Sequence, residues 1–467
     1  MKHPVYVIFQ LDTEDFITPE TDEVSLHLTL IFNKYGVKGS FAIVGEKARV
    51  LVKRKRWDII EALKTQDIAY QSNYHSVHPI IGEYLKDKDL EEGVQEVIKR
   101  ESPGLKDLEK IFGMKPSAFV QPGGAWAPQV PYAMRKLGIR VYADGIFEFQ
   151  PVWFCNVISV RHNVSFRGRE AGSREHLEWL KSEFEKRYEE LRDTGGFIIV
   201  VLHPCILRTW MFWDTVNFEN GKSPEKLFPA PLFSDEEYQR KIEEFDEFVK
   251  YVVNHPNVRV ITFRELPELI EETPDTIPIR LVSELAKKVL NSLSYYNIEN
   301  IMLSAAEAFG VLVATLAHYY TEKKLPSEVR VRSLLGPIKS PPHVRTKITV
   351  STGSILEACY DLNKSLDSTE YLPSSIKIED KEIGPGTFMK VLATLIALLD
   401  EKKEIPDTVQ VNPWKEIPEI PGVDLSERVE RQWKWIIYPR NFRSQKILEY
   451  TLLQTWTWKP TKLNPLS

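Results

Sequence analysis

The sequence predicts an α/β fold for residues 1–270, and two observations lead to this class. Short apolar runs, rich in β-branched and aromatic residues, alternate with longer amphipathic segments. Three of these runs are followed within four residues by acidic residues or histidine, and parallel α/β folds carry their chemistry at the carboxyl ends of strands. We therefore expect a parallel sheet covered by helices, with a candidate site along one edge.

The strands and helices follow this alternation in order. The first apolar run, Val5 to Leu11, has the length and composition of a buried strand. We expect further strands at 39–44, 67–71, 117–120, 141–143, 152–160, 197–202 and 258–262. Between them we expect helices near 20–35, 45–65, 89–112, 128–137, 174–194 and 236–253. Such an alternation predicts a sheet that closes as a barrel.

Three carboxylates follow the first strand, in the stretch Asp12-Thr13-Glu14-Asp15. Like charges this close raise each other's pKa and repel one another unless a cation or a reaction uses them. The alternative is an acidic helix start, in which Thr13 or Asp15 caps the segment that follows.

Histidines follow two later strands. After 67–71 come His75 and His78, three residues apart, a spacing that suits metal ligands on one helical turn. The strand at 197–202 ends at His203-Pro204, where a lone histidine is more often a structural residue. Three polar clusters at three strand ends favour one shared site.

This order of motifs resembles the polysaccharide deacetylases, also called NodB-homology proteins or carbohydrate esterase family four. The similarity covers residues 1–270, and the 39–45 segment suits the second strand of the family. It implies a distorted, seven-stranded (β/α) barrel of the polysaccharide deacetylase type. Two glutamines depart from the family pattern: Gln71 replaces a ligand histidine, and Gln121 replaces an arginine. The other register of the histidine motif pairs His75 with His78.

The resemblance implies metal-assisted hydrolysis of an amide. Asp12 would take the proton of a metal-bound water, and His203 would protonate the leaving amine. The expected ligands of the divalent ion, with zinc expected, are His75, then Glu14 or Asp15, then Gln71 or His78. The residues expected to shape the acetyl pocket are Gln121, Gly123, Gly124, Trp126 and Asp144.

At 467 residues the chain is too long for one core, so more than one domain is expected. The acidic, proline-containing stretch 271–280 is the expected linker, and 281–467 the expected second, mainly helical domain. Two segments beginning near Leu303 and Ile383 match without a gap at an offset of eighty residues, which predicts an internal two-fold repeat. Each weakly resembles pseudomurein-binding repeats, which implies glycan binding. The alternative is a scaffold or dimerisation domain.

Composition and charge exclude several classes of partner and of structure. The net charge of -5 lacks the basic footprint of a nucleic-acid-binding protein. Three scattered cysteines fit neither a disulfide framework nor a zinc ribbon. No apolar run is long enough for a transmembrane helix, and no targeting segment precedes the first strand, so we expect a cytoplasmic protein without a membrane partner.

Three functions are compatible with these residues. The first is a metal-dependent hydrolase that removes acetyl groups from N-acetylated sugars or glycans. The second is a catalytically impaired protein of the same fold that binds glycan. The third is an amidase that acts on a small non-sugar amide. Metal content separates the first two.

Overall fold

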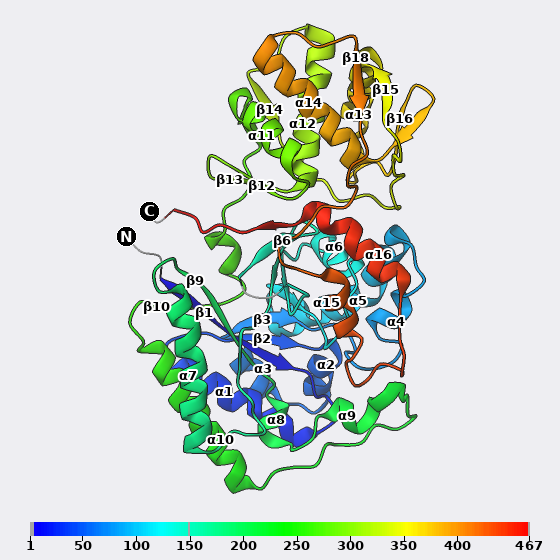
Figure 1. Cartoon of the computed structure of the whole chain (residues 1–467). Helices are drawn as coiled ribbons and strands as arrows, with labels where there is room; N and C mark the ends of the chain where they lie inside the picture. The colour runs from blue at the N-terminus through cyan, green and yellow to red at the C-terminus, as the bar shows by residue number, and fades with distance from the viewer. Residues whose placement is uncertain (1–3, 148–149, 466–467) are drawn as a thin grey trace.

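The computed structural model describes residues 4–147 and 150–465. A large body holds the main sheet and its covering helices, and a smaller body lies above it (Figure 1). The last part of the chain runs back from the smaller body along the larger one (Figure 1). In the described residues no helix has the length and apolar character needed to cross a membrane.

The main sheet confirms the predicted α/β class. Its strands are β1 (Val5–Thr13), β2 (Ser40–Ile43), β3 (Asp67–Tyr70), β4 (Ala118–Val120), β5 (Val141–Ala143), β6 (Val152–Phe154), β7 (Val157–Val160), β8 (Val164–Ser165), β9 (Gly196–Leu202), β10 (Val258–Ile261) and β19 (Lys459–Pro460). The order is β19-β6-β7-β5-β4-β3-β2-β1-β9-β8, and β10 also pairs with β1. The pairs β6–β7 and β6–β19 are antiparallel, and the others are parallel. The sheet is thus a curled half-barrel, and within the described residues it does not close into a ring.

Helices cover the outside of this half-barrel close to the predicted positions. They are α1 (Asp22–Lys34), α2 (Gly45–Lys53), α3 (Trp57–Leu63), α4 (Ile81–Leu85), α5 (Leu90–Phe112), α6 (Gln129–Lys136), α7 (Arg174–Leu191), α8 (Cys205–Arg208), α9 (Trp213–Phe218) and α10 (Asp235–Val253). The sequence did not predict α4, α8 and α9, which are too short for a periodic apolar pattern.

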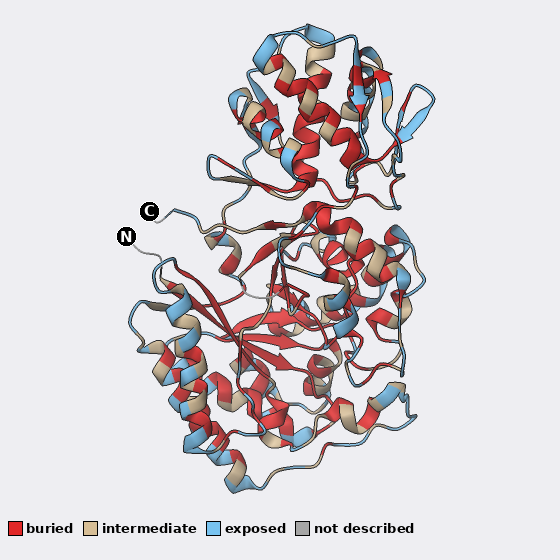
Figure 2. Ribbon diagram, in the orientation of Figure 1, coloured by how far each residue is buried: buried red, intermediate tan, exposed pale blue. Residues whose placement is uncertain are grey.

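Alternation along β1 separates the two faces of the sheet. Val5, Val7, Phe9 and Leu11 belong to the core between sheet and helices. Tyr6 and Ile8 belong instead to the core inside the half-barrel, together with the small side chains Ala42, Ala69, Ala118 and Ala143. Because side chains alternate, Gln10 and Asp12 continue the inner face. Buried residues run along the central strands of the main sheet (Figure 2).

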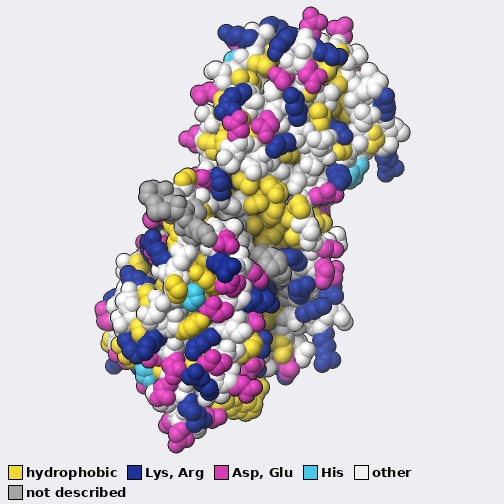
Figure 3. Space-filling model, turned by 60° about the vertical axis from the view of Figure 1, so that its left-hand side comes forward, with side chains coloured by type: hydrophobic (Ala, Val, Ile, Leu, Met, Phe, Trp, Pro, Cys, Tyr) yellow, Lys and Arg dark blue, Asp and Glu magenta, His cyan; other side chains and the backbone are white. Residues whose placement is uncertain are grey.

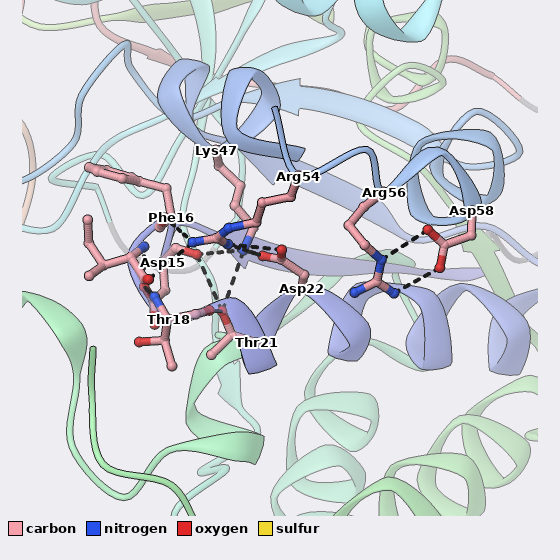
Figure 4. Close-up of polar contacts among 10 residues, drawn as sticks. Asp15, Phe16, Thr18, Thr21, Asp22, Lys47, Arg54, Arg56 and Asp58 are labelled. Atoms are coloured by element: carbon pink, nitrogen blue, oxygen red, sulfur yellow. Dashed lines mark hydrogen bonds and ion pairs between the residues drawn. The ribbon is translucent and has the colours of Figure 1, made fainter. Parts of the chain in front are cut away.

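A buried ion cluster fixes the chain where it leaves β1 (Figure 4). The Lys47 ammonium, 2% exposed, donates to the Asp15 carbonyl oxygen at 2.5 Å and to Asp22 Oδ1 at 2.6 Å. Arg54 also binds Asp22, at 2.9 Å, and donates to the carbonyl oxygens of Phe16 and Ile17. The loop after β1 is thereby held against α1 and α2.

The smaller body contains the predicted repeat. The first copy is β11 (Thr276–Pro278), α11 (Ile279–Asn291), β12 (Tyr296–Ile298), β13 (Ile301–Leu303), α12 (Ala305–Glu322) and β14 (Glu328–Arg330). The second is β15 (Ile348–Ser351), α13 (Thr352–Ser365), β16 (Ile376–Ile378), β17 (Lys381–Ile383), α14 (Pro385–Lys402) and β18 (Thr408–Val411). In each copy the first strand pairs with the last, and the middle two form a hairpin. Since α11 packs on α14 and α12 on α13, the copies interlock.

The expected boundaries need a correction at both ends of the repeat domain. Residues 276–278, placed in the linker, form β11 and pair with β14. The chain after Val411 leaves the repeat domain and returns to the half-barrel as α15 (Leu425–Gln432), α16 (Gln445–Leu453) and β19. The physical reason is burial, because Leu425, Val429 and Ile437 belong to the core of the large body. We call residues 412–465 the C-terminal segment.

Two side chains of the C-terminal segment join the bodies. Trp456, fully buried, packs edge-on against Phe309 of α12 at 6.2 Å, and its Nε1 donates to the Glu416 carbonyl oxygen. Lys459 forms a buried ion pair with Glu307 of α12 at 2.8 Å. The same lysine sits on β19, paired with β6, so the ion pair connects the main sheet to the repeat domain.

Trp456→Ala should therefore destabilise the protein strongly. Removing a fully buried tryptophan leaves a cavity at the junction, and we expect a loss of roughly 3–5 kcal/mol in unfolding free energy. Urea denaturation followed by circular dichroism measures it. Trp210→Ala is the control, because Trp210 is 51% exposed and its loss should cost little. Equal effects of the two substitutions would contradict the joining role of Trp456.

Candidate functional site

Polar side chains from four strand ends form one connected chain inside the half-barrel. Gln10 Nε2, on β1, donates to Asp12 Oδ1 at 2.9 Å and to Asp144 Oδ2 at 2.5 Å. Asp12 Oδ2 lies 3.5 Å from His203 Nε2, just after β9. Asp144 Oδ1, after β5, lies 2.6 Å from His162 Nδ1, just beyond β7. The predicted residues Asp12, Asp144 and His203 are therefore brought together.

The pKa values of the two carboxyl groups in this series of contacts, Asp12 and Asp144, shift in opposite directions. Burial raises the pKa of Asp12 well above its usual value, and the charges of Asp144 and Glu14 add to this. Burial also opposes ionisation of Asp144, but the charge and hydrogen bond of His162 lower its pKa to about 2. Two neighbouring carboxyl groups with separated pKa values can divide the acid and base roles of a reaction.

His203 completes the pair with Asp12. Its side chain is 31% exposed, so it is the member of the pair that reaches solvent. Burial of the rest of the ring lowers the pKa of His203, although the charges of Glu14 and Asp144 act in the other direction. At neutral pH the imidazole is therefore neutral and can accept a proton.

A second pair lies beside the first. Glu14 Oε2 is 3.0 Å from His75 Nε2, and Trp213 Nε1 donates to Glu14 Oε1 at 3.1 Å. Burial raises the pKa of Glu14, but the His75 charge outweighs it and the pKa is lowered. The His75 ring lies between two indoles, with ring centroids 5.7 Å from Trp213 and 5.6 Å from Trp435. The pair is closed off from solvent, since Glu14 and His75 are both buried.

Two of the predicted metal ligands have local partners on one of their polar atoms. Asp15 Oδ1 accepts hydrogen bonds from the backbone nitrogens of Ile17 and Thr18, so this carboxylate caps the turn after β1. His78 Nδ1 lies 2.7 Å from Glu83 Oε2 on α4. The contacts of Asp15 Oδ1 support the capping alternative for this residue. The second atoms of the two groups, Asp15 Oδ2 and His78 Nε2, are buried without a hydrogen-bond partner, so the ligand assignments of Asp15 and His78 stay predictions.

The remaining donors do not fit a zinc site. Among the described residues, no three histidine, cysteine, aspartate or glutamate side chains come together at metal-ligand spacing. Gln71 is buried with its Oε1 unpaired, and its side chain hydrogen-bonds to Asp12. Glu14, His75 and a neutral amide oxygen are a weak set for zinc, which prefers imidazole, thiolate and carboxylate ligands. We therefore derive no chemical step through a metal.

Two of the predicted pocket residues, Trp126 and Gln121, are buried and hydrogen-bonded within the protein. Trp126 is fully buried, and its Nε1 donates to Thr451 Oγ1 on α16 at 3.0 Å. Gln121 Oε1 accepts from the Tyr142 hydroxyl at 3.0 Å, and its Nε2 donates to the Gly123 carbonyl oxygen and to Gln432 Oε1. Both side chains thus hold the loop after β4 in place.

The C-terminal segment explains the two glycines of that loop. A Cβ atom at Gly123 would lie 2.1 Å from the Trp435 ring, and one at Gly124 would lie 2.0 Å from the Gln432 carbonyl oxygen. Tyr438 also donates its hydroxyl to the Gly124 carbonyl oxygen at 3.2 Å. The glycines are required by this close approach, and half-buried Trp435 becomes a wall of the site next to His75.

Sequence reasoning missed Gln10, His162, Trp213, Asp214 and Trp435 as members of the site. His162 could have been found, because it lies two residues beyond the apolar run Val157 to Val160. Asp214, whose pKa burial and the Glu14 charge raise to about 6, lies on the short helix α9 and has no comparable signal. Trp435 is far away in the sequence, and only the fold brings it to His75.

Comparison with known proteins finds similarity in three dimensions. No protein-family model matches the chain. No curated protein sequence matches it either.

The N-terminal half is similar in fold to polysaccharide deacetylases. One, from Mycobacterium smegmatis, has 14% identity and a TM-score of 0.39, covering 57% of this chain and 90% of that one. Another, from Pseudomonas aeruginosa PAO1, has 12% identity and a TM-score of 0.41, covering 56% and 90%. A mutant of BA3943, described as a CE4 family pseudoenzyme, has 14% identity and a TM-score of 0.33, covering 57% and 68%.

One buried carboxyl holds the loop that carries His75. Glu101 Oε2, on α5, accepts from the Tyr70 hydroxyl at 2.7 Å and from the Asn73 backbone nitrogen at 2.8 Å. Burial raises the pKa of Glu101 to about 7. Between its ordinary pKa and 7, the folded protein holds a proton that the unfolded chain releases. Its contribution to stability is therefore complete at low pH and is lost as the pH rises to 7.

Glu101→Gln should remove this pH dependence, because a glutamine oxygen can accept both hydrogen bonds without a charge. We expect the variant to exceed the wild type in unfolding free energy at pH 8, by up to about 3 kcal/mol, and to match it near pH 4. Urea denaturation at the two pH values measures this. Glu91→Gln, an exposed position on the same helix, is the control. A variant less stable at pH 8 would show that Glu101 is needed as a carboxylate.

Proposed function

We propose that the protein is a hydrolase that cleaves a carbon–nitrogen bond, with the acetamido group of an N-acetylated sugar or glycan as its substrate. The single observation that carries the proposal is the Asp12–His203 pair beside Asp144. The pair lies at the carboxyl ends of β1 and β9, Asp144 lies at that of β5, and the carboxyl groups of Asp12 and Asp144 differ in pKa. The motif resemblance supplies the bond type.

The pKa directions favour exchanging the two roles assigned from the sequence. Neutral His203 takes a proton from the attacking water, whose oxygen forms the new bond to the acyl carbon. Asp12, the carboxyl group that retains its proton more readily, donates it to the nitrogen as the carbon–nitrogen bond breaks. The proton on His203 then returns to Asp12 across their 3.5 Å contact, which restores both groups.

The neighbouring groups support this cycle. Asp144 stays ionised, and the hydrogen bonds of Gln10 hold the two carboxyl groups at a fixed separation. Phe212 packs edge-on against the His203 ring at 5.0 Å and fixes its plane. Trp435 offers an apolar surface on the far side of the site, suited to a sugar ring or an acetyl group.

A second function remains in competition, a protein of this fold that binds glycan without turnover. The specific observation in its favour is the donor set around Glu14 and His75, which lacks a third strong ligand among the described residues. Hydrolysis of a small non-sugar amide would use the same pair, Asp12 and His203, and differs only in substrate.

Asp12→Asn should abolish hydrolysis while leaving the fold intact. The amide cannot act as an acid or base, so we expect the rate to fall at least about a hundredfold. The assay measures free amine released from N-acetylglucosamine oligomers, and from acetamide for the third candidate. Asp87→Asn, 84% exposed on the surface, is the control. If the wild type binds the oligomers and releases no amine, glycan binding without turnover replaces the hydrolase.

Gln71→His tests the altered donor set separately. The new imidazole would join Glu14 and His75 as a third strong ligand, so we expect zinc affinity to rise at least about tenfold. Elemental analysis and competition with a chromogenic chelator measure it without any assay of activity. Gln239→His, at an exposed position on α10, is the control. If the wild type already carries zinc at full occupancy, the conclusion that its donors are weak is wrong.

A further inference from the structure

A cleft runs between the large body and the repeat domain, away from the candidate site. Its volume is about 370 Å³, and the residues used below are Arg135, Arg140, Trp153, Glu272, Glu307 and Lys459. A second cavity of about 270 Å³ adjoins it and shares Trp153, Glu272 and Lys459. The molecule narrows where the two bodies meet, and hydrophobic side chains gather there among charged ones (Figure 3).

The cleft lies at the opposite end of the strands from Asp12 and His203. Arg135 is in the last turn of α6, and Arg140 directly precedes β5, so both mark the amino end of that strand. The candidate site occupies the carboxyl end of the same strand at Asp144. A ligand in the cleft would therefore not reach the catalytic pair.

Charges in the cleft are balanced except for one. Arg140 is paired with Glu272, and Lys459 with Glu307. The Arg135 side chain has neither an ion pair nor a hydrogen bond within residues 4–147 and 150–465. Its neighbour Cys155 is a buried thiol whose pKa burial raises, so it stays neutral and gives no compensation. One positive charge is left over.

Partial burial of the Arg135 side chain makes its charged form unfavourable in free energy. The side chain is partly buried, and the burial lowers the pKa of its guanidinium. A cation withdrawn from water without an anion beside it is unfavourable, and a bound carboxylate with two oxygens fits the guanidinium fork. An anionic ligand bound in the cleft would therefore supply the partner that the Arg135 guanidinium lacks.

Trp153 supplies an apolar surface in the same cleft. It lies on β6 and is half-buried, and the β6–β19 pairing sets it opposite Lys459. The Lys459 ammonium lies 5.8 Å from the centre of its ring. A flat indole beside fixed charges suits a ligand with a ring that carries polar groups.

We propose that this cleft binds a sugar acid, with its carboxylate on Arg135 and its ring against Trp153. The volume is within the range of small-molecule sites and accommodates one or two sugar rings. Because the cleft is built from both bodies, the ligand would bridge the half-barrel and the repeat domain. The inference stands independently of the proposed hydrolysis.

Calorimetry on the full chain with matched probes tests the proposal. D-glucuronate and D-glucose differ in the carboxylate and contain no acetamido group, and diglycine carries a carboxylate without a ring. We expect glucuronate to bind at least about tenfold more tightly than either of the others. Arg135→Gln should remove that advantage, and Arg135→Lys should retain part of it. Arg192→Gln, an exposed arginine at the end of α7, should behave as the wild type.

Thermal unfolding without ligand gives a second measurement. Since Arg135 has no partner to lose, Arg135→Gln should have a Tm equal to or above that of the wild type. Equal affinities for glucuronate and glucose, unchanged binding by Arg135→Gln, or diglycine binding as tightly as glucuronate would each overturn the proposal. A lower Tm for Arg135→Gln would also overturn it, because the guanidinium would then have a structural role.

Discussion

The pairing of β1 along both of its edges is the constraint on which the candidate site depends. One edge pairs with β9 from Val5 to Leu11, and the other pairs with β10 at its start and with β2 at its end. A strand held on both sides cannot slip in register. A shift of one residue would exchange the two faces and turn Leu11, in place of Asp12, into the half-barrel. Every distance from Asp12 to its neighbours follows from this register.

Neutral amides set the electrostatic character of the site. Gln10 hydrogen-bonds to two carboxyl groups at once, and Gln71 to Asp12. Burial and the charges of Asp144 and Glu14 raise the pKa of Asp12, and the two amide hydrogen bonds lower it only in part because neither amide brings a positive charge. An imidazole at position 71 would place a potential cation beside this carboxyl group and would favour its ionised form. The two glutamines therefore help to determine the charge state of Asp12.

The fold of the first 270 residues was largely predictable, because its signals are local. Apolar runs identify the strands, and the polar residues that follow them include Asp12 and His203, which the fold brings to 3.5 Å of each other. The sequence says least where a local partner or a distant segment decides the surroundings of a side chain. Asp15 Oδ1 and His78 Nδ1 have local partners that the sequence pattern does not reveal. Gly123 and Trp126 were assigned to a pocket, but Trp435 and Thr451 occupy the space beside them. No local pattern could reveal a contact between segments this far apart.

The return of the C-terminal segment also sets the order in which the protein can be assembled during translation. The strands that carry Asp12, Asp144 and His203 leave the ribosome early, and the whole repeat domain follows before Trp435 and Lys459 emerge. Until then the loop with Gly123 lacks its covering indole, and β6 presents an unpaired edge. A nascent chain therefore exposes its sheet edge throughout the synthesis of the repeat domain, the period when a chaperone would have most to protect.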